Sequence, residues 1–249
     1  MRRIAMWSGP RNISTAMLRA FENRPDTCVV DEPFYGYYLA QTGIDHPGHE
    51  DIITGMDCDW RSVARSLTEE APDPLADVYY QKHMTKHMLP EMDLAFMDCL
   101  THCFLIREPR RMIASFARVV PEFDMDELGF SQQIMLFRRV CDRLGEAPPV
   151  IDSALTLQDP ASVLGQLCER IGIPFCGEML HWPAGRRDSD GIWAPHWYAS
   201  VEASTGFAEP ESHAAPFMLP ERYEGLCREA EAIYAEMLEY VIRPEQLKL

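Results

Sequence analysis

The chain has 249 residues, of which 47% are hydrophobic and 25% are charged, and its formal net charge at pH 7 is −16. This composition suits one large α/β domain over residues 1–249, and the negative charge excludes the global basic field that recruits nucleic acid. No apolar run is long enough to span a membrane and no signal peptide opens the chain, so we expect a cytoplasmic protein that binds neither membrane nor nucleic acid.

The first predicted elements are a short strand and a helix, joined by a polar turn. The apolar run 4–7 ends at Trp7, and apolar residues recur at helical spacing from Ile13 to Phe21. A helix that begins directly after a strand presents unpaired N–H groups and the positive end of its dipole at the turn. The turn therefore predicts a binding site for a phosphate-like anion.

The rest of the chain alternates short apolar runs with amphipathic helices. Further strands are predicted at 27–30, 76–82, 101–106 and 150–152. Helices are predicted at 60–70, 109–120, 131–144, 160–171 and about 220–242, and residues 185–207 read as a functional loop with some helix. Strands that alternate with helices form a parallel sheet covered on both faces, and ligands bind at the carboxyl ends of its strands. We therefore expect an α/β fold of three layers with functional residues directly after strands.

The turn after the first strand can be compared with known phosphate loops. Against the Walker A pattern G-x-x-x-x-G-K-[ST], the chain keeps Thr15 but has Ser8, Ile13 and Ser14 in place of both glycines and the lysine. The turn instead resembles the P-R-S-G-[ST]-T phosphosulfate loop of sulfotransferases, with the residues Pro10, Arg11, Asn12, Ile13, Ser14 and Thr15.

This loop departs from the sulfotransferase pattern at two positions. Asn12 replaces a serine, and Ile13 replaces a glycine, although a β-branched residue cannot supply the positive φ that glycine allows. The alternative interpretation is an ordinary helix start capped by Asn12 or Ser14. Support for a phosphosulfate loop must therefore come from elsewhere in the chain.

Two later segments resemble the other motifs with which sulfotransferases hold 3′-phosphoadenosine 5′-phosphosulfate (PAPS). Arg107 ends a strand and Ser115 lies eight residues later on the following helix, an arrangement that holds the 3′-phosphate in this family. Arg186 and Arg187, with Trp193, match part of the pattern R-K-G-x-x-G-D-W-K-N-x-F, whose first glycine, aspartate and Lys-Asn pair are missing here. The chain is therefore identified as a member of the bacterial sulfotransferase-like P-loop family over about residues 1–207. The resemblance implies a three-layer, P-loop NTPase-like fold.

The resemblance also implies an activity. A sulfotransferase moves the sulfuryl group of PAPS, as co-substrate, to a hydroxyl or amine of a small-molecule acceptor, and this transfer requires no metal ion. Arg11, together with the N–H groups and hydroxyls of Ser14 and Thr15, would stabilise the leaving phosphate. The sequence is compatible with a homodimer and does not identify the acceptor.

The general base that takes the acceptor's proton has several candidates. Glu32 ranks first, because Asp31-Glu32-Pro33 resembles the G-E-P context in which other bacterial sulfotransferases carry a catalytic glutamate. His83 ranks second, because Lys82-His83 lies where cytosolic sulfotransferases have a K-T-H motif, and His87 ranks third. His83 and His87 lie four residues apart but lack the glutamate of H-E-x-x-H and a third ligand, so no metal site is expected.

Two other functions remain open from the sequence. The first is a P-loop NTPase or small-molecule kinase, for which Asp31 and Asp152 are the candidate carboxylates for magnesium, although the Walker lysine is missing. The second is a non-catalytic nucleotide-binding protein of the same fold.

Overall fold

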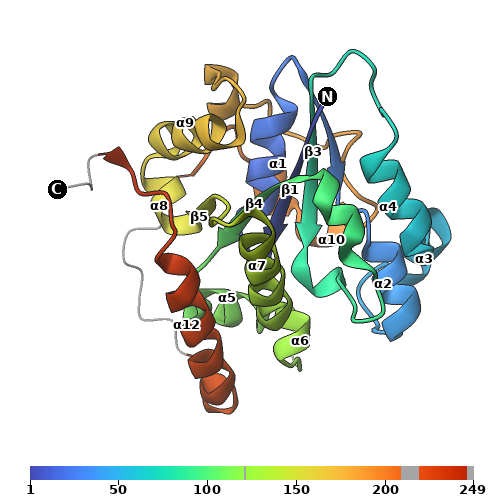
Figure 1. Ribbon diagram of the computed structural model, residues 1–249. Helices are drawn as coiled ribbons and strands as arrows, with labels where there is room; N and C mark the ends of the chain where they lie inside the picture. Colours follow the sequence, from blue (N-terminus) through green and yellow to red (C-terminus); the bar gives the residue numbers. More distant parts are fainter. Residues whose placement is uncertain (121, 209–218, 246–249) are drawn as a thin grey trace.

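The centre of the molecule is a parallel β-sheet, seen in a computed structural model that describes residues 1–120, 122–208 and 219–245 (Figure 1). Within these residues the sheet has five strands in the order β2-β3-β1-β4-β5, and every neighbouring pair is parallel. The strands are β1 (Arg2–Ser8), β2 (Thr27–Asp31), β3 (Val78–Met84), β4 (Thr101–Ile106) and β5 (Val150–Asp152). The predicted α/β fold with a parallel sheet is confirmed.

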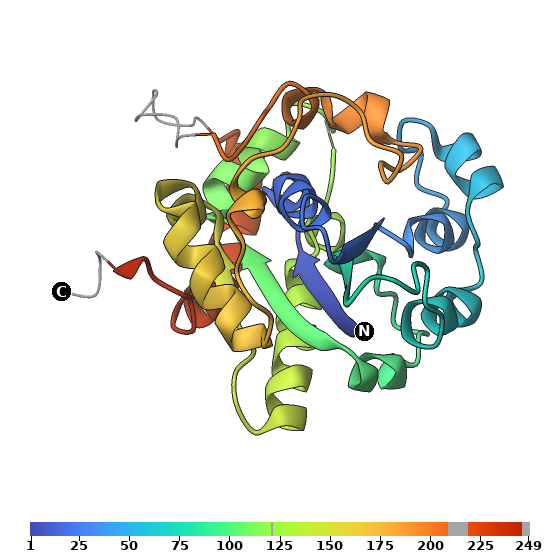
Figure 2. The ribbon, with the colours of Figure 1, turned by 90° about the horizontal axis from the view of Figure 1, so that it is seen from above.

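Helices cover both faces of the sheet, because the strands are apolar on both sides. The larger ones are α1 (Ser14–Glu22), α4 (Trp60–Thr68), α5 (Pro109–Phe116), α7 (Phe130–Leu144), α9 (Pro160–Ile171) and α12 (Glu224–Leu238). Figure 2 shows α1 and α7 on opposite sides of β1 and β4, and the apolar core on the side of α1 also includes α9. The predicted three layers are therefore confirmed.

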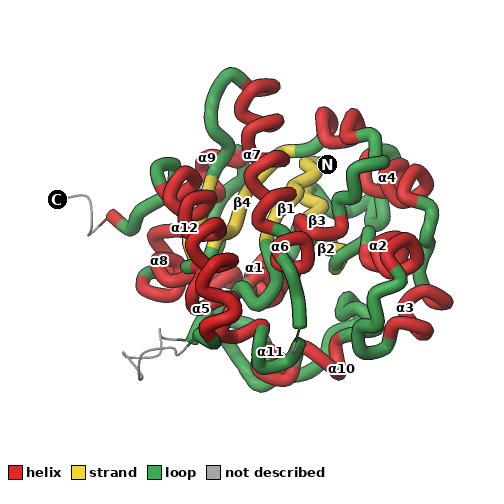
Figure 3. Tube along the Cα trace, turned by 90° about the horizontal axis from the view of Figure 1, so that it is seen from below, coloured by secondary structure: helices red, strands yellow, loops and turns green. Residues whose placement is uncertain are grey.

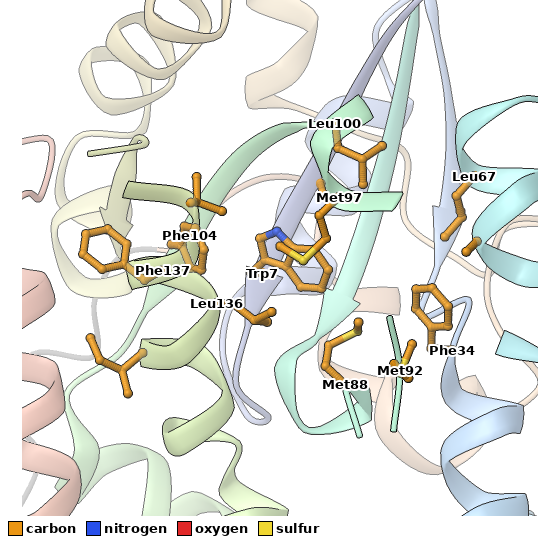
Figure 4. Close-up of a cluster of buried hydrophobic side chains, with 14 of the residues drawn as sticks. Trp7, Phe34, Leu67, Met88, Met92, Met97, Leu100, Phe104, Leu136 and Phe137 are labelled. Carbon is orange, nitrogen blue, oxygen red and sulfur yellow. The ribbon is translucent and has the colours of Figure 1, made fainter. Parts of the chain in front are cut away.

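Alternate residues of the strands build a separate core on each face. Ile4 and Met6 of β1 pack with α1 and α9, while Trp7 of the same strand and Phe104 of β4 pack with α4, α7 and α12. Figure 4 shows the second cluster, in which Trp7 lies among side chains from several of these elements. Both cores hold the carboxyl ends of the central strands in fixed positions.

Several shorter helices lie near the ends of the sheet. They are α2 (Tyr35–Thr42), α3 (His49–Gly55), α6 (Met125–Leu128), α8 (Ser153–Gln158), α10 (Ala194–Trp197) and α11 (Ala199–Glu202). Short 3-10 helices occur at Thr85–His87, Leu94–Cys99, Gly177–Leu180 and Glu221–Tyr223. Among the described residues no helix is both long and apolar enough to cross a membrane.

Some element boundaries differ from the sequence prediction for local reasons. Strand β3 runs on to Met84, beyond its pairing with β2, because His83 and Met84 pair with Trp7 and Ser8 of β1. Helix α5 ends at Phe116, whose carbonyl accepts hydrogen bonds from two following N–H groups in a turn. Helix α12 ends at Leu238, and Val241, predicted as helical, instead forms a parallel bridge with β5.

Candidate active site

A pocket of about 110 Å³ opens at the carboxyl edge of the sheet, next to the loop between β1 and α1. Figure 3 looks onto this edge, around which α2, α6 and α10 are seen. The pocket is lined by Pro10, Arg11, Asn12, Ser14, Thr15, Glu32, Tyr35, His46, Lys82, Met84, Lys86, Phe116, Trp193, Trp197 and Tyr198. The pocket thus joins the predicted phosphate loop to the first candidate base, Glu32.

The phosphate loop reaches its shape without glycine at position 13. Arg11 takes a positive φ of 52°, whereas Ile13 has φ −84° and ψ 21°, which a β-branched residue tolerates. The positive φ in this loop is therefore taken by Arg11 and not by the residue at position 13. Asn12 fixes the loop, because its side chain accepts from the N–H of Ile13 and donates to the carbonyl of Leu105 in β4.

The start of α1 is available to an anion. No side chain of the described residues caps this helix, so the N–H groups of its first turn remain for another acceptor, and Asn12 and Ser14 are not its caps. The Arg11 side chain and the hydroxyl residues Ser14 and Thr15 line the pocket at the same point. A permanent positive charge, two hydroxyl groups and a helix N-terminus are groups suited to an anion, and we call this point the candidate anion site.

The structure brings the second motif against this loop. The Nε of Arg11 donates to the Oγ of Ser115 at 3.1 Å, and Arg107 donates to the backbone carbonyl of Arg11. Burial, and the nearby charge of Arg118, lower the pKa of Arg11. The predicted residues Arg11, Arg107 and Ser115 therefore form one basic cluster, of which Arg11 lines the pocket.

The third motif, which contains Arg186 and Arg187, does not lie next to the phosphate loop. Arg186 is exposed, and the guanidinium of Arg187 lies 3.9 Å from Glu22, the last residue of α1. A helix of nine residues is about 13 Å long, so this pair lies at the opposite end of α1 from the candidate anion site. The path of the segment that carries Arg186 and Arg187 is fixed by a buried ion pair, in which Arg19 lies 2.6 Å from Asp190.

A buried network joins the strand ends to the segment before α11. The ammonium of Lys82 lies 2.7 Å from each of three oxygens, which belong to Asp31, Glu32 and Tyr198. Tyr198 donates in turn to the second oxygen of Asp31 at 2.6 Å and accepts from the indole N–H of Trp193 at 3.0 Å. Burial acts to lower the pKa of Lys82, but the two carboxylates raise it well above its ordinary value. Lys82 is therefore a charged anchor that holds the aromatic segment over the pocket.

Glu32 is the candidate base that lines the pocket. Its backbone has a positive φ of 42°, which is unusual for glutamate and directs the residue away from the strand path of β2. One carboxylate oxygen pairs with Lys82, while the other lies 3.9 Å from Nε2 of His87. Burial raises the pKa of Glu32, and the Lys82 ammonium acts against that rise. A buried carboxylate of raised pKa is suited to accept a proton.

His83 and His87 do not line the pocket. The ring of His83 stacks on Trp7 with centroids 4.4 Å apart and its Nε2 contacts the side-chain carbonyl of Gln81, on the core side of β3. Burial lowers the pKa of His83 to about 3, so the ring is neutral. His87 is stacked on Tyr35, and among the described residues neither of its ring nitrogens has a hydrogen-bond partner.

The carboxylates considered for magnesium are occupied by protein groups. Asp152 accepts from two N–H groups at the start of α8 and from the hydroxyl of Tyr234. Asp31 is bonded to Lys82 and Tyr198. In residues 1–120, 122–208 and 219–245, no three His, Cys, Asp or Glu side chains form a group that could hold a metal ion.

Several pocket residues were not predicted as site residues. The pocket is also lined by Lys82, Lys86, His46 and Tyr198. Of these, only the two lysines stand out in the sequence. The chain has three lysines, and two of them lie at the end of the predicted strand 76–82 and four residues later.

Removing the Lys82 ammonium should destabilise the fold strongly. Lys82→Met leaves Asp31 and Glu32 buried without their shared cation, and we expect the free energy of unfolding to fall by about 3–5 kcal/mol in urea denaturation. Arg138→Ala, which breaks an exposed pair with Glu236, is the control and should change the free energy of unfolding little. Equal stabilities of the two variants would show that the Lys82 network does not hold the site.

Comparison with known proteins gives the chain clear relatives. Residues 1–238 match the family model described as a sulfotransferase domain. Branched-chain-amino-acid aminotransferase-like protein 1 of Arabidopsis thaliana is 36% identical over 216 residues, which make up 87% of this chain and 38% of that protein. Its paralogue, protein 2, is 34% identical over 217 residues with the same coverage. The chain thus spans well under half the length of these plant relatives.

Solved structures share the same architecture. The sulfotransferase domain of the Synechococcus PCC 7002 olefin synthase superposes with a TM-score of 0.57 at 15% identity and covers 94% of each chain. A sulfotransferase from Alicyclobacillus acidocaldarius gives a TM-score of 0.56 at 11% identity and covers 97% of each chain. At such low identity the likeness shows the fold alone.

Proposed function

Because the chain belongs to the sulfotransferase domain family, we propose that it transfers a sulfuryl group from PAPS to a hydroxyl or amine of a small-molecule acceptor. The observation that carries this proposal is the pocket, in which the candidate anion site at the start of α1 and a buried carboxylate, Glu32, line one space of about 110 Å³. An anionic donor and a proton acceptor are the two requirements of this reaction.

The donor's phosphate groups would be held by the phosphate loop. Arg11, Ser14 and Thr15 line the pocket at the start of α1 and would bind the phosphate from which sulfur departs. Arg107 and Ser115, which contact Arg11, complete the basic cluster that would hold the 3′-phosphate. Arg186 and Arg187 have no part in this proposal, because they lie at the other end of α1.

The acceptor's proton would pass to Glu32. The acceptor oxygen or nitrogen attacks sulfur in line with the S–O bond to the phosphate, that bond breaks, and adenosine 3′,5′-bisphosphate leaves with the bonding electrons. The proton released by the acceptor moves to the carboxylate of Glu32, which lines the pocket. The Lys82 ammonium, at 2.7 Å, keeps Glu32 in place and ionised before the transfer.

The acceptor would lie between aromatic side chains. Tyr35, Trp193 and Trp197 line the pocket beside Glu32, and the Lys82 network fixes the segment that carries both tryptophans. These walls favour a small acceptor with a flat or apolar body and one reacting hydroxyl or amine.

Turnover of labelled PAPS tests the proposal directly. The protein should convert PAPS to adenosine 3′,5′-bisphosphate in the presence of a mixture of small hydroxylated and aminated compounds, and the label should appear in one of them. The conversion should not change when a metal chelator is added. A protein that binds the bisphosphate but transfers label to no compound in a broad acceptor set would contradict an enzymatic role.

A further inference from the structure

His46 is a buried histidine in the wall of the pocket. It follows α2, and its ring lies among those of Tyr35, Tyr38 and Trp197, whose centres are 5.9, 6.2 and 6.5 Å away. The residue is 4% exposed, and its backbone carbonyl accepts from the N–H of His49 at the start of α3. The imidazole is therefore held in one place beside the space in which the acceptor would lie.

One nitrogen of the His46 ring has a hydrogen-bond partner and the other has none. Nδ1 lies 2.8 Å from the hydroxyl oxygen of Tyr35, while Nε2 has no partner in the part of the chain that the structure describes. An oxygen of Glu127 lies 3.8 Å from Nε2, which is too far for a hydrogen bond. A buried nitrogen without a partner costs free energy unless a ligand or a water molecule supplies one.

The neighbours of the His46 ring decide which nitrogen carries the proton. Burial and the nearby charge of Lys86 lower the pKa of His46 to about 3, so the ring is neutral and has one N–H group. The carboxylate of Glu127 favours the proton on Nε2, which faces it, and the hydroxyl of Tyr35 then donates to Nδ1. His46 thus offers one N–H donor that no described residue accepts.

We propose that the Nε2–H of His46 binds a hydroxyl group of the acceptor, so that the acceptor is a diol or an amino alcohol. One hydroxyl or amine of this molecule would react beside Glu32, and a second group, a hydroxyl, would accept from His46. A hydroxyl also has a proton of its own, which it can donate to the carboxylate of Glu127 beside the ring. This inference rests on the proposed function and narrows the class of its acceptor.

The charges around His46 favour a neutral group over an ionised one. The ammonium of Lys86 acts to lower the pKa of Glu127, and Glu127 acts to raise that of Lys86, so the two charges oppose each other beside the ring. A carboxylate placed at His46 would be repelled by Glu127, and an ammonium would be repelled by Lys86. The rings of Tyr35 and Trp197 would pack against the carbon body of the acceptor.

Binding of matched alcohols to the complex with adenosine 3′,5′-bisphosphate tests the inference. The probes are aromatic diols and amino alcohols whose functional groups lie a few carbons apart, each paired with an analogue that lacks the second hydroxyl. By calorimetry the parent protein should bind the best of these probes roughly threefold to tenfold more tightly than its analogue, because one hydrogen bond is added. The preference should vanish in His46→Phe and largely remain in His46→Gln, whose amide N–H can replace Nε2–H.

Two results would overturn the inference. The first is a parent protein that binds every probe and its analogue equally, and the second is a folded His46→Phe protein that keeps the preference of the parent. NMR of the imidazole nitrogens tests the parent protein without any variant. The Nε2–H signal of His46 should shift when a preferred diol is added and stay in place with its analogue, and a signal that the diol leaves unchanged would also overturn the inference.

The fate of the label from PAPS separates this inference from the proposed function. Transfer to alcohols with a single hydroxyl, with no preference for diols or amino alcohols, would contradict the inference and leave the proposed function standing. Binding of a diol through His46 without transfer of label to it or to any other compound would contradict the proposed function and leave the binding site standing.

Discussion

Arg11→Ala is expected to lose turnover by roughly a hundredfold to a thousandfold, because the variant lacks the cation that would stabilise the leaving phosphate. Arg11 is the one arginine lining the described pocket, and it also joins Arg107 and Ser115 to the phosphate loop. Binding of adenosine 3′,5′-bisphosphate should weaken together with turnover. Alanine takes the same positive φ of 52° that arginine already has at this position, so the substitution removes the charge without adding backbone strain.

The comparison variants for Arg11 separate charge from backbone strain. Arg11→Gly accepts the positive φ and should be as inactive as Arg11→Ala, since both lack the guanidinium. Arg138→Ala removes an exposed arginine far along α7 and should keep full turnover. Full activity of Arg11→Gly would show that the loop works through its backbone N–H groups alone, against our account.

Glu32→Gln is the second large expected effect. The amide cannot accept the acceptor's proton, so turnover should fall by roughly a hundredfold to ten-thousandfold while the affinity for adenosine 3′,5′-bisphosphate stays close to that of the parent. Because burial raises the pKa of Glu32, the rate of the parent should rise with pH as this carboxyl loses its proton, in a range above that of an ordinary glutamate. Kinetics of sulfuryl transfer across pH measure both effects.

The histidine variants decide between the candidate bases. His83→Phe should keep its turnover, because the ring lies on the core side of β3 against Trp7 and does not line the pocket. His87→Phe should likewise keep most of it, since the nearest oxygen of Glu32 is 3.9 Å from the ring. Loss of activity in a folded His83→Phe protein, together with an active Glu32→Gln protein, would reverse the assignment.

The parts of the fold that sequence predicted are those with strong local patterns. The apolar run 101–106 became β4 with the predicted bounds, and the helix predicted at 60–70 became α4, which begins at the predicted residue. The helix α8 was missed, because its six residues are too few for a periodic pattern and follow β5 directly.

The candidate site was predicted where motif and strand end coincide. Arg11, Glu32 and Arg107 follow the ends of strands, and parallel strands bring such residues to one edge, while Ser115 lies on the helix that follows Arg107. Arg186 and Arg187 depended on a partial motif in a long loop, whose path is set by the contact of Asp190 with Arg19, 171 residues away. A local pattern does not contain that contact.

The contacts of Lys82 could not be predicted from the sequence for the same reason. The partners of Lys82 are Asp31, Glu32 and Tyr198, which lie 50 to 116 residues away along the chain. The sequence places Lys82 at the end of a predicted strand, and only the fold shows that it is a structural anchor with three oxygen partners.

The most direct test of the account is calorimetric titration of the protein with adenosine 3′,5′-bisphosphate and, separately, with ATP, each with and without magnesium. Our account predicts tight binding of the bisphosphate that does not depend on magnesium and is lost in Arg107→Ala, whose side chain anchors the phosphate loop. A preference for ATP with magnesium would contradict the sulfotransferase proposal and favour a kinase or NTPase. Binding of neither nucleotide would contradict a nucleotide site at the start of α1.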